Sequence, residues 1–298
     1  MTRVARSWLY VPGHHPERIA KALAAGADAV VIDLEDAVPP EHKQLARQSA
    51  IRAAETRAAD DGAPRLWVRV NDPMGPWGEA DLDALHGAPL DGLRVPHTES
   101  AVVVRGVAQR SRLPLQLLLE TAAGLMNAQE LAAAHPQVAG IGLGEADLAA
   151  DLRVVSEEGL VWARGWVVAV SRAAGLPSPI QSVWTNVADT EGLRTSTEQA
   201  RQTGFLGRSV IHPRQIPVVH SVFTPSPAEI DAAVAIVEAF EQARLRGEVA
   251  VLDDKGHFID PAVVDRARLV LELGNGPSQP SFSPGIPGAT PSPHQESS

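Results

Sequence analysis

Residues 113–144, LPLQLLLETAAGLMNAQELAAAHPQVAGIGLG, contain two apolar runs separated by a stretch with helical spacing. The runs 113–120 and 138–144 are almost continuously apolar, as is typical of strands whose two faces are both covered. Between them, residues 122–134 carry apolar side chains three or four positions apart, which predicts an amphipathic helix. The segment is therefore expected to form a β–α–β unit with parallel strands.

The same alternation extends in both directions along the chain. The predicted strands are 6–12, 29–36, 66–72, 92–98, 113–120, 138–144, 179–185 and 207–212. Helical spacing recurs between them, for example at 16–25, 42–59 and 191–203. Eight β-then-α units within roughly 210 residues predict an α/β fold of the TIM (β/α)8 barrel type. A doubly wound sheet is the alternative, but it would be expected to carry a glycine-rich phosphate loop, and the chain has neither GxGxxG nor the P-loop pattern.

The domain boundaries follow from where this alternation stops. Residues 1–222 are expected to form the barrel and residues 223–274 a C-terminal helical extension. Within the extension, 225–246 and 261–273 have helical spacing, and 249–260 is predicted to form a hairpin. In the tail, 275–298, Pro, Ser and Gly make up more than half of the residues, which predicts disorder.

Composition excludes several classes of protein. The 298 residues carry a formal net charge of −10 and include no cysteine. The negative charge argues against nucleic acid or an anionic membrane as a partner, and the lack of cysteine excludes disulfides, zinc–thiolate sites and cysteine nucleophiles. The N-terminal apolar run is too short for a secretion signal, and no stretch approaches the about 20 apolar residues of a membrane span. A soluble, cytoplasmic protein is expected.

Two acidic residues follow neighbouring predicted strands, where a barrel places its active site. Glu120 ends the run LPLQLLLE, and Asp147 lies just after IGLG. Adjacent carboxylates repel each other unless a proton or a cation lies between them, and Mg²⁺ accepts such a pair while water and substrate complete its coordination. Both acids could instead stabilise the N-termini of the following helices, and spacing alone leaves the two interpretations open.

Arg69 and Asp260 also have two interpretations each. Arg69 lies inside the apolar run LWVRVND, where an arginine needs a planar anionic partner. That partner could be a substrate carboxylate, or Glu35, Asp36 or Glu120 in a structural ion pair. Asp260 precedes a proline, the pattern of a helix N-cap. Because it lies beyond the eighth strand, it has no obvious route to the mouth of its own barrel, and a neighbouring subunit could supply it instead.

Eight segments of the chain, taken in order, resemble one known family. They are RSWLYVPG, GADAVVIDLEDAV, VRVN, VPHTES, LLLETAAGLMNAQE, LGEADLAADL, DTEGL and GRSVIHPRQI. Each is a weak signal alone, but the ordered set resembles the citrate lyase beta-subunit branch of the HpcH/HpaI aldolase family, which includes malyl-CoA and citramalyl-CoA lyases. The resemblance runs from about residue 6 to 273. It implies a TIM barrel, usually assembled as a homotrimer or hexamer.

The resemblance also implies roles for individual residues. Glu120 and Asp147 match Mg²⁺ ligands, and Arg69 matches an arginine that binds substrate and stabilises the developing enolate. The residues that it places at the substrate are Arg69, Glu120, Glu35, Asp36, Glu145 and Ala146. Asp260 matches a catalytic aspartate that reaches into the site of a neighbouring subunit.

Three positions depart from the pattern of the family. His97 replaces a lysine, which predicts a weaker contact to a thioester or phosphate. Ala146 stands where a glutamate is common, although Glu145 could compensate, and Gln181 replaces an aspartate. These changes leave the class of reaction intact and the choice of substrate open.

The activity implied is that of a Mg²⁺-dependent carbon–carbon lyase. The expected substrate is a 3-hydroxyacyl thioester such as citryl-, citramalyl- or malyl-CoA, or the same acyl group on a carrier. The products would be a 2-oxo acid, such as oxaloacetate, and an acetyl thioester, such as acetyl-CoA. The alternatives are a hydroxyacyl-CoA thioester hydrolase and a non-catalytic homologue that only binds the ligand.

Overall fold

The computed structural model describes residues 4–57, 62–248, 250–252 and 256–274. Contacts within the chain divide it into two compact units, Met1–Ser226 and Pro227–Ser298. The tail predicted to be disordered, 275–298, lies outside the described residues. None of the helices in the described part of the chain is long and apolar enough to cross a membrane.

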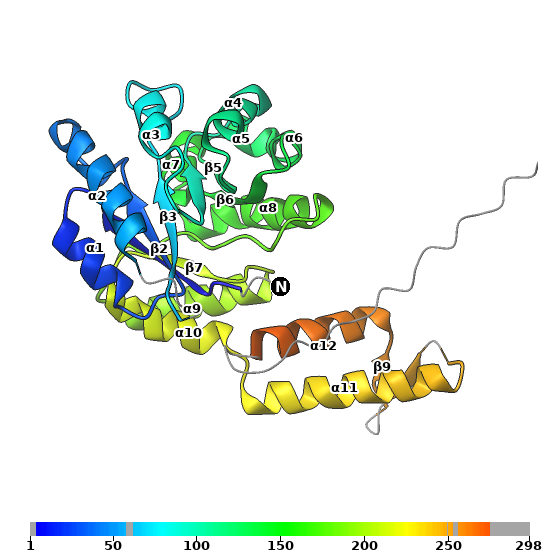
Figure 1. The fold of residues 1–298 in the computed structure, drawn as a ribbon. Helices are drawn as coiled ribbons and strands as arrows, with labels where there is room; N and C mark the ends of the chain where they lie inside the picture. Colours follow the sequence, from blue (N-terminus) through cyan, green and yellow to red (C-terminus); the bar gives the residue numbers. More distant parts are fainter. Residues whose placement is uncertain (1–3, 58–61, 249, 253–255, 275–298) are drawn as a thin grey trace, which may run out of the picture. The chain divides into compact units, whose positions relative to one another are not determined.

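The first unit is built on a curled parallel sheet, in which the described residues form seven strands (Figure 1). The strands are β1 (Ser7–Pro12), β2 (Ala29–Asp33), β3 (Arg65–Arg69), β4 (Gly92–Val95), β5 (Leu115–Leu119), β6 (Val138–Leu143) and β7 (Arg208–Val210). Their order is β6-β5-β4-β3-β2-β1-β7, so the last strand pairs with the first. Pairing of the last strand with the first is how a barrel closes, and the predicted TIM-barrel architecture is confirmed.

Helices lie outside this sheet, as expected for strands with two apolar faces (Figure 1). They are α1 (Pro16–Leu23), α2 (Lys43–Thr56), α3 (Gly78–Ala84), α4 (Ala101–Ser111), α5 (Ala122–Met126), α6 (Ala128–Ala132), α7 (Glu145–Leu152), α8 (Val161–Ala173), α9 (Thr190–Gln202) and α10 (Ile216–Phe223), with 3₁₀ turns η1 (Pro40–His42), η2 (Glu157–Leu160) and η3 (Pro213–Gln215). The helix predicted at 122–134 is divided at Asn127 into α5 and α6.

The strand predicted at 179–185 is wrong in extent. Only Gln181 pairs there, in a single parallel bridge with Arg208 of β7. Prolines at 177 and 179 lack the N–H donors that a strand ladder requires. On the other side, the Ser182 hydroxyl donates to the carbonyl of Leu143 at 2.6 Å, so a side chain makes the link to β6.

Two tryptophans fill the interior of the barrel. Trp8 of β1 and Trp67 of β3 are buried with ring centroids 5.2 Å apart. A Cβ at Gly92 of β4 would lie 2.3 Å from the Trp67 ring, so only glycine leaves room for it. Large and small side chains on neighbouring strands thus pack the base of the barrel, below the strand ends that carry the polar residues.

The second unit is a small helical layer. It contains α11 (Pro227–Leu245), β8 (Val251–Leu252), β9 (Phe258–Ile259) and α12 (Pro261–Gly274). The two short strands pair in antiparallel fashion, and part of the turn predicted between them, 253–255, lies outside the described residues. Val237, Ile259 and Val264 belong to its buried cluster. The helix, hairpin and helix expected for this region are all present.

Candidate active site

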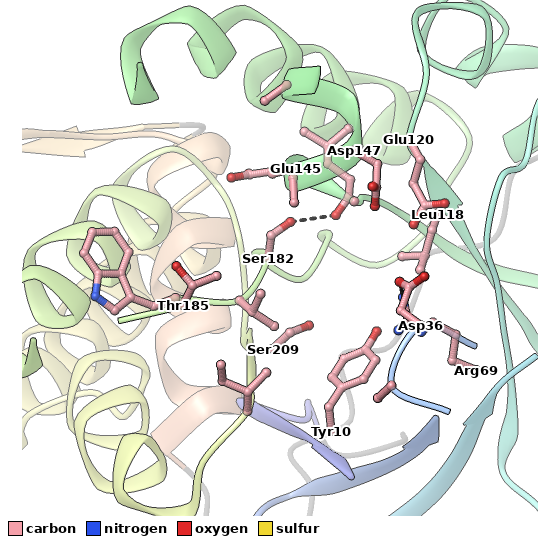
Figure 2. A pocket seen from close by; sticks show the side chains of 18 of the residues that line it. Tyr10, Asp36, Arg69, Leu118, Glu120, Glu145, Asp147, Ser182, Thr185 and Ser209 are labelled. Atoms are coloured by element: carbon pink, nitrogen blue, oxygen red, sulfur yellow. Dashed lines mark hydrogen bonds and ion pairs between the residues drawn. The ribbon is translucent and has the colours of Figure 1, made fainter. Parts of the chain in front are cut away.

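A cavity of about 930 Å³ opens at the carboxyl ends of the strands. Its lining includes Asp36, Arg69, Glu120, Glu145, Ala146 and Asp147, six of the residues predicted for the site. Figure 2 shows the side chains of Glu120 and Asp147 on the same side of this cavity. Glu35 lines a smaller neighbouring cavity of about 290 Å³. Tertiary structure therefore brings together polar residues that end or follow four different strands.

Glu120, directly after β5, is only 3% exposed. Its Oε2 accepts a hydrogen bond from the backbone N–H of His97 at 2.8 Å. A Cβ at Gly144 would lie 2.4 Å from its Cγ, so the glycine after β6 is needed to admit this side chain. Burial raises the pKa of Glu120, and the nearby charge of Asp147 acts in the same direction. A cation bound beside these two acids would remove that repulsion.

Asp147 and Glu145 lie in the first turn of α7, but their surroundings differ. The Glu145 carboxylate is bound by Arg164, with Nη2–Oε2 at 2.6 Å and Nε–Oε1 at 2.9 Å. Arg164 also contacts Glu157 at 2.5 Å. Glu145 is therefore engaged by an arginine. The suggestion that its carboxylate compensates for Ala146 would require it to leave this pair and remains a prediction.

Arg69 of β3 makes a fork of two 2.7 Å hydrogen bonds to Asp33, from Nε to Oδ1 and from Nη2 to Oδ2. Its Nη1 lies 2.9 Å from Glu35 and 3.0 Å from Asp36. Two of the three structural partners considered for this arginine, Glu35 and Asp36, are thus present, and Glu120 is not among its ion pairs. Its best-formed pair is with Asp33, which sequence reasoning did not single out. Asp33 also accepts from the backbone N–H groups of Glu35 and Ala37, which turns the chain after β2. That turn ends β2 at residue 33, before the predicted end at 36.

The group around Arg69 has more acids than cations. Asp33 accepts the two hydrogen bonds of the Arg69 fork. Glu35 therefore lies close enough to Arg69 for an ion pair, but its Oε2 accepts no hydrogen bond. Burial raises the pKa of Glu35 to about 8; the charge of Arg69 opposes this shift, and the neighbouring acids add to it. His97, at φ 49°, lies 3.4 Å from Glu35 and 3.5 Å from Glu120. The residue that replaces a lysine thus lies between the two acids.

This surplus of negative charge fits a divalent cation. Among the described residues, no group of three or more His, Asp or Glu side chains is arranged to hold a metal alone. Glu120 and Asp147 would supply two ligands and leave the others to water and substrate, a set that suits Mg²⁺.

Asp260 lies in the second unit, at the start of α12. Its Oδ1 accepts a hydrogen bond from the backbone N–H of Val263 at 2.9 Å, which is the bond of an N-cap. The capping interpretation therefore has direct geometric support. The catalytic role implied by the resemblance remains a prediction.

Residues 6–213, which include every strand of the barrel, match the HpcH/HpaI aldolase/citrate lyase family. The chain belongs to this family. The predicted relationship is thereby confirmed, and the family is one of enzymes, as its description as aldolases and citrate lyases states.

Curated relatives include members with two different names. The (3S)-malyl-CoA thioesterase of Cereibacter sphaeroides is 40% identical over 259 residues, covering 84% of this chain and 88% of that one. The citrate lyase subunit beta of Leuconostoc mesenteroides is 33% identical over 288 residues, covering 92% and 94%. The family is shared, and the choice between cleavage and hydrolysis stays open.

Solved relatives contain ligands of the expected kind. CitE from Mycobacterium tuberculosis in complex with magnesium, acetoacetate and coenzyme A is 31% identical, covers 92% of this chain and 100% of that one, and has a TM-score of 0.77. The same organism's citrate lyase beta subunit with oxaloacetate and magnesium is 33% identical, covers 74% and 98%, and has a TM-score of 0.66. The prediction of Mg²⁺ as cofactor agrees with both.

Proposed function

We propose that this protein is a Mg²⁺-dependent carbon–carbon lyase that cleaves a 3-hydroxyacyl thioester into a 2-oxo acid and an acetyl thioester. The observation that supports this most is the placement of Arg69, Glu120 and Asp147 around one cavity. An anion-binding fork and a pair of cation-binding carboxylates are the two features that the reaction needs, because it starts from a hydroxy acid and develops an enolate.

The chemistry balances without an oxidant or reductant. The substrate hydroxyl loses its proton, and the bond between its carbon and the neighbouring CH₂ carbon breaks. The hydroxyl carbon becomes the ketone of the 2-oxo acid, and the electron pair of the broken bond forms the thioester enolate. A proton delivered to the enolate carbon then gives the acetyl thioester.

Residues of this chain would take separate parts in that sequence. Glu120 and Asp147 would hold Mg²⁺, which when bound supplies Lewis-acid activation of the substrate hydroxyl. Arg69, held in orientation by Asp33, would offset the charge of the enolate, an interaction typically worth about 3 kcal/mol. Glu35, Asp36 and the turn at Glu145–Ala146 would orient the substrate. Asp260 of a neighbouring subunit would donate the final proton, which requires the homotrimer or hexamer expected for the family.

A thioesterase is the second candidate, and the names of the curated relatives that share about 40% identity with this chain favour it. In that reaction, water attacks the thioester carbonyl carbon, the C–S bond breaks and the thiolate leaves with a proton. The hydroxy acid would be released with its carbon skeleton intact. The two activities therefore differ in every product.

Product analysis decides between them. Citryl-, citramalyl- and malyl-CoA would each be incubated with the enzyme and Mg²⁺, and the products identified by mass spectrometry. Acetyl-CoA together with a 2-oxo acid is the expected result. Free CoA together with the intact hydroxy acid would establish the thioesterase, and no turnover of any of the three would reject the proposal.

A second experiment tests the two acids. Glu120→Gln and Asp147→Asn should each lower turnover by at least about 100-fold and weaken Mg²⁺ binding measured by calorimetry. The melting temperature of the metal-free protein should stay the same or rise, because each change removes one of two repelling charges. Glu130→Gln, at an exposed position on α6, is the matched control. Wild-type turnover in either variant at limiting Mg²⁺ would contradict the assignment.

A further inference from the structure

Arg94 is a buried arginine that the proposed mechanism leaves unused. It lies on β4 beside Arg69 in the sheet register and is 2% exposed, yet it lines the same cavity as Glu120 and Asp147. Its guanidinium carbon lies 5.5 Å from the ring centroid of Trp8 and 5.4 Å from that of Tyr10. These aromatic contacts hold the cation in place without neutralising it.

The guanidinium of Arg94 is also short of hydrogen-bond partners. Among the described residues, its only hydrogen bond runs from Nη1 to the Ser209 hydroxyl at 3.2 Å, and its Nε is buried with no partner. No carboxylate of the described chain lies within ion-pair distance, whereas the neighbouring Arg69 has three. Burial lowers the pKa of Arg94, as expected for a cation without an anionic partner. Buried charges are normally paired, so an anion from outside the chain is the missing partner.

A second buried arginine shows that burial alone does not make such a site. Arg208 of β7 is also 2% exposed. Its Nε is also buried with no partner, but its Nη1 has two hydroxyl partners, Ser196 at 3.1 Å and Thr197 at 3.2 Å, and it does not line the cavity. Arg94 differs because its unpaired N–H groups border the space that a substrate would occupy.

The polar lining around Arg94 lies apart from the two metal-binding candidates. Its contacts Tyr10 and Ser209 lie across the cavity from Glu145 and Asp147 in Figure 2. The Tyr10 ring also lies 5.4 Å from the guanidinium carbon of Arg69. The cavity thus has an acidic side, suited to a cation, and an opposite side where a cation and two hydroxyls converge. A ligand that satisfies both sides needs one anionic group at the cation and a second one across from it.

We infer that Arg94, with Ser209 and Tyr10, binds a second carboxylate of the substrate and so selects acyl groups of the citryl type. The inference rests on the proposed function and deepens it. A citryl group carries an extra CH₂COO⁻ on its hydroxyl carbon, whereas a citramalyl group carries a methyl there and a malyl group only hydrogen. The matching product would be a 2-oxo acid with two carboxylates, oxaloacetate, instead of pyruvate or glyoxylate.

Binding of products tests this selection without any turnover. Dissociation constants of oxaloacetate and pyruvate would be measured by calorimetry at one saturating Mg²⁺ concentration. We expect the wild type to bind oxaloacetate at least tenfold more tightly, and Arg94→Met to reduce that preference below threefold with little change for pyruvate. Arg208→Met removes an equally buried charge and should keep the preference.

A structural role for Arg94 predicts different results. In that case Arg94→Met would lower the melting temperature and weaken the binding of oxaloacetate and pyruvate equally. If Arg94 is instead an unpaired buried cation, its loss should leave the melting temperature unchanged or raised. If the methionine variant does not fold, Arg94→Gln gives the same comparison. Equal weakening of both ligands, an unchanged preference in the variants, or a wild type without preference would each overturn the inference.

Turnover separates this inference from the proposed function. If the wild type cleaves thioesters and Arg94→Met leaves the ratio of kcat/KM for citryl-CoA over citramalyl-CoA unchanged, the carboxylate site is rejected and the lyase stands. If no thioester is cleaved but Arg94→Met abolishes the preference for oxaloacetate, the lyase is rejected and the carboxylate site stands. If Arg94→Met lowers the ratio of kcat/KM for citryl-CoA over citramalyl-CoA by tenfold or more, the result supports both the lyase and the carboxylate site.

Discussion

At the scale of single residues, the candidate site is governed by an imbalance of charge. Arg69 faces Asp33, Glu35 and Asp36, while Glu120 is buried nearby with no arginine of its own. One guanidinium cannot neutralise this set, so protons and cations from solution must complete it. Chemistry at the site is therefore expected to depend on pH and on divalent metal.

The fork of Arg69 leads to a prediction about side-chain shape. Arg69→Lys should lower kcat/KM by at least tenfold, or about 1.4 kcal/mol, because an ammonium cannot reproduce both 2.7 Å bonds to Asp33 and still face the substrate. Steady-state kinetics measures the effect. Arg110→Lys, in an exposed pair with Glu79, should be silent, and unchanged kinetics for Arg69→Lys would show that the planar fork is not required.

Glu35 predicts a dependence of stability on pH in the metal-free protein. Its pKa is raised from an ordinary 4.5 to about 8, so the folded state holds a proton that the unfolded state releases. This contribution to stability is fully present below pH 4.5 and is lost as pH rises through 8. The free energy of unfolding of the wild type relative to Glu35→Gln should fall over this window by at most about 1.4 kcal/mol per pH unit.

Urea titrations of both proteins at several pH values in the presence of chelator measure this difference. Glu130→Gln is exposed and should differ from wild type by a constant amount across the same range. Parallel stability profiles for wild type and Glu35→Gln would show that the Glu35 carboxyl is not held protonated by the fold.

At the scale of elements, the junction of β6 with α7 controls the position of Glu120, the residue directly after β5. Gly144 follows β6 as the N-cap residue of α7 and has no side chain at the point where Glu120 passes. The strands β4 and β6 pair with β5 on its two sides. The backbone N–H of His97, which follows β4, donates a hydrogen bond to the Glu120 carboxylate and so completes its support. The site therefore depends on close packing of three strand ends.

A pair of glycine variants tests this packing. Gly144→Ala places a Cβ 2.4 Å from Glu120 Cγ, whereas a Cβ at Gly142, two residues earlier on β6, meets its first neighbour at 3.7 Å. Gly144→Ala should therefore displace Glu120, weaken Mg²⁺ binding and lower kcat/KM at least tenfold, while Gly142→Ala should be nearly silent. Calorimetry and kinetics check both, and normal Mg²⁺ binding by Gly144→Ala would contradict the packing argument.

At the scale of the whole molecule, the residues of the proposed mechanism are divided between two compact units. Arg69, Glu120 and Asp147 belong to Met1–Ser226, and Asp260 belongs to Pro227–Ser298. Asp260 has a defined local function as the cap of α12. The two roles proposed for it, cap and proton donor, predict opposite effects of one conservative change.

Asp260→Asn should keep the cap, because asparagine caps about as well as aspartate, so the melting temperature should be unchanged. If the residue also donates a proton in a neighbouring subunit, turnover should fall by about 10²- to 10⁴-fold. Mixing this variant with Arg69→Ala under subunit exchange should then restore part of the activity, with the oligomer size followed by light scattering. Full activity of Asp260→Asn, or mixed oligomers no more active than their parents, would reject the shared site.

The sequence by itself determined the alternation of strands and helices and the acids at the strand ends. These features are local, because an apolar run, a helical spacing and the residue that follows each strand are all visible along the chain. The resemblance to the family, the parallel barrel and the location of Arg69, Glu120 and Asp147 around one cavity could therefore be predicted. Proline spacing at 177–179 was a local signal against the seventh strand that the prediction did not weigh.

Only the tertiary structure decided which residues meet. The pairing of Arg69 with Asp33 depends on the register between β2 and β3, and the room for Glu120 depends on Gly144 from another strand. The isolation of Arg94 depends on how the strands meet, which leaves its Nε buried with no hydrogen-bond partner in the described chain. Register and close packing arise from contacts between segments far apart in sequence, so the pattern within any one segment does not contain them.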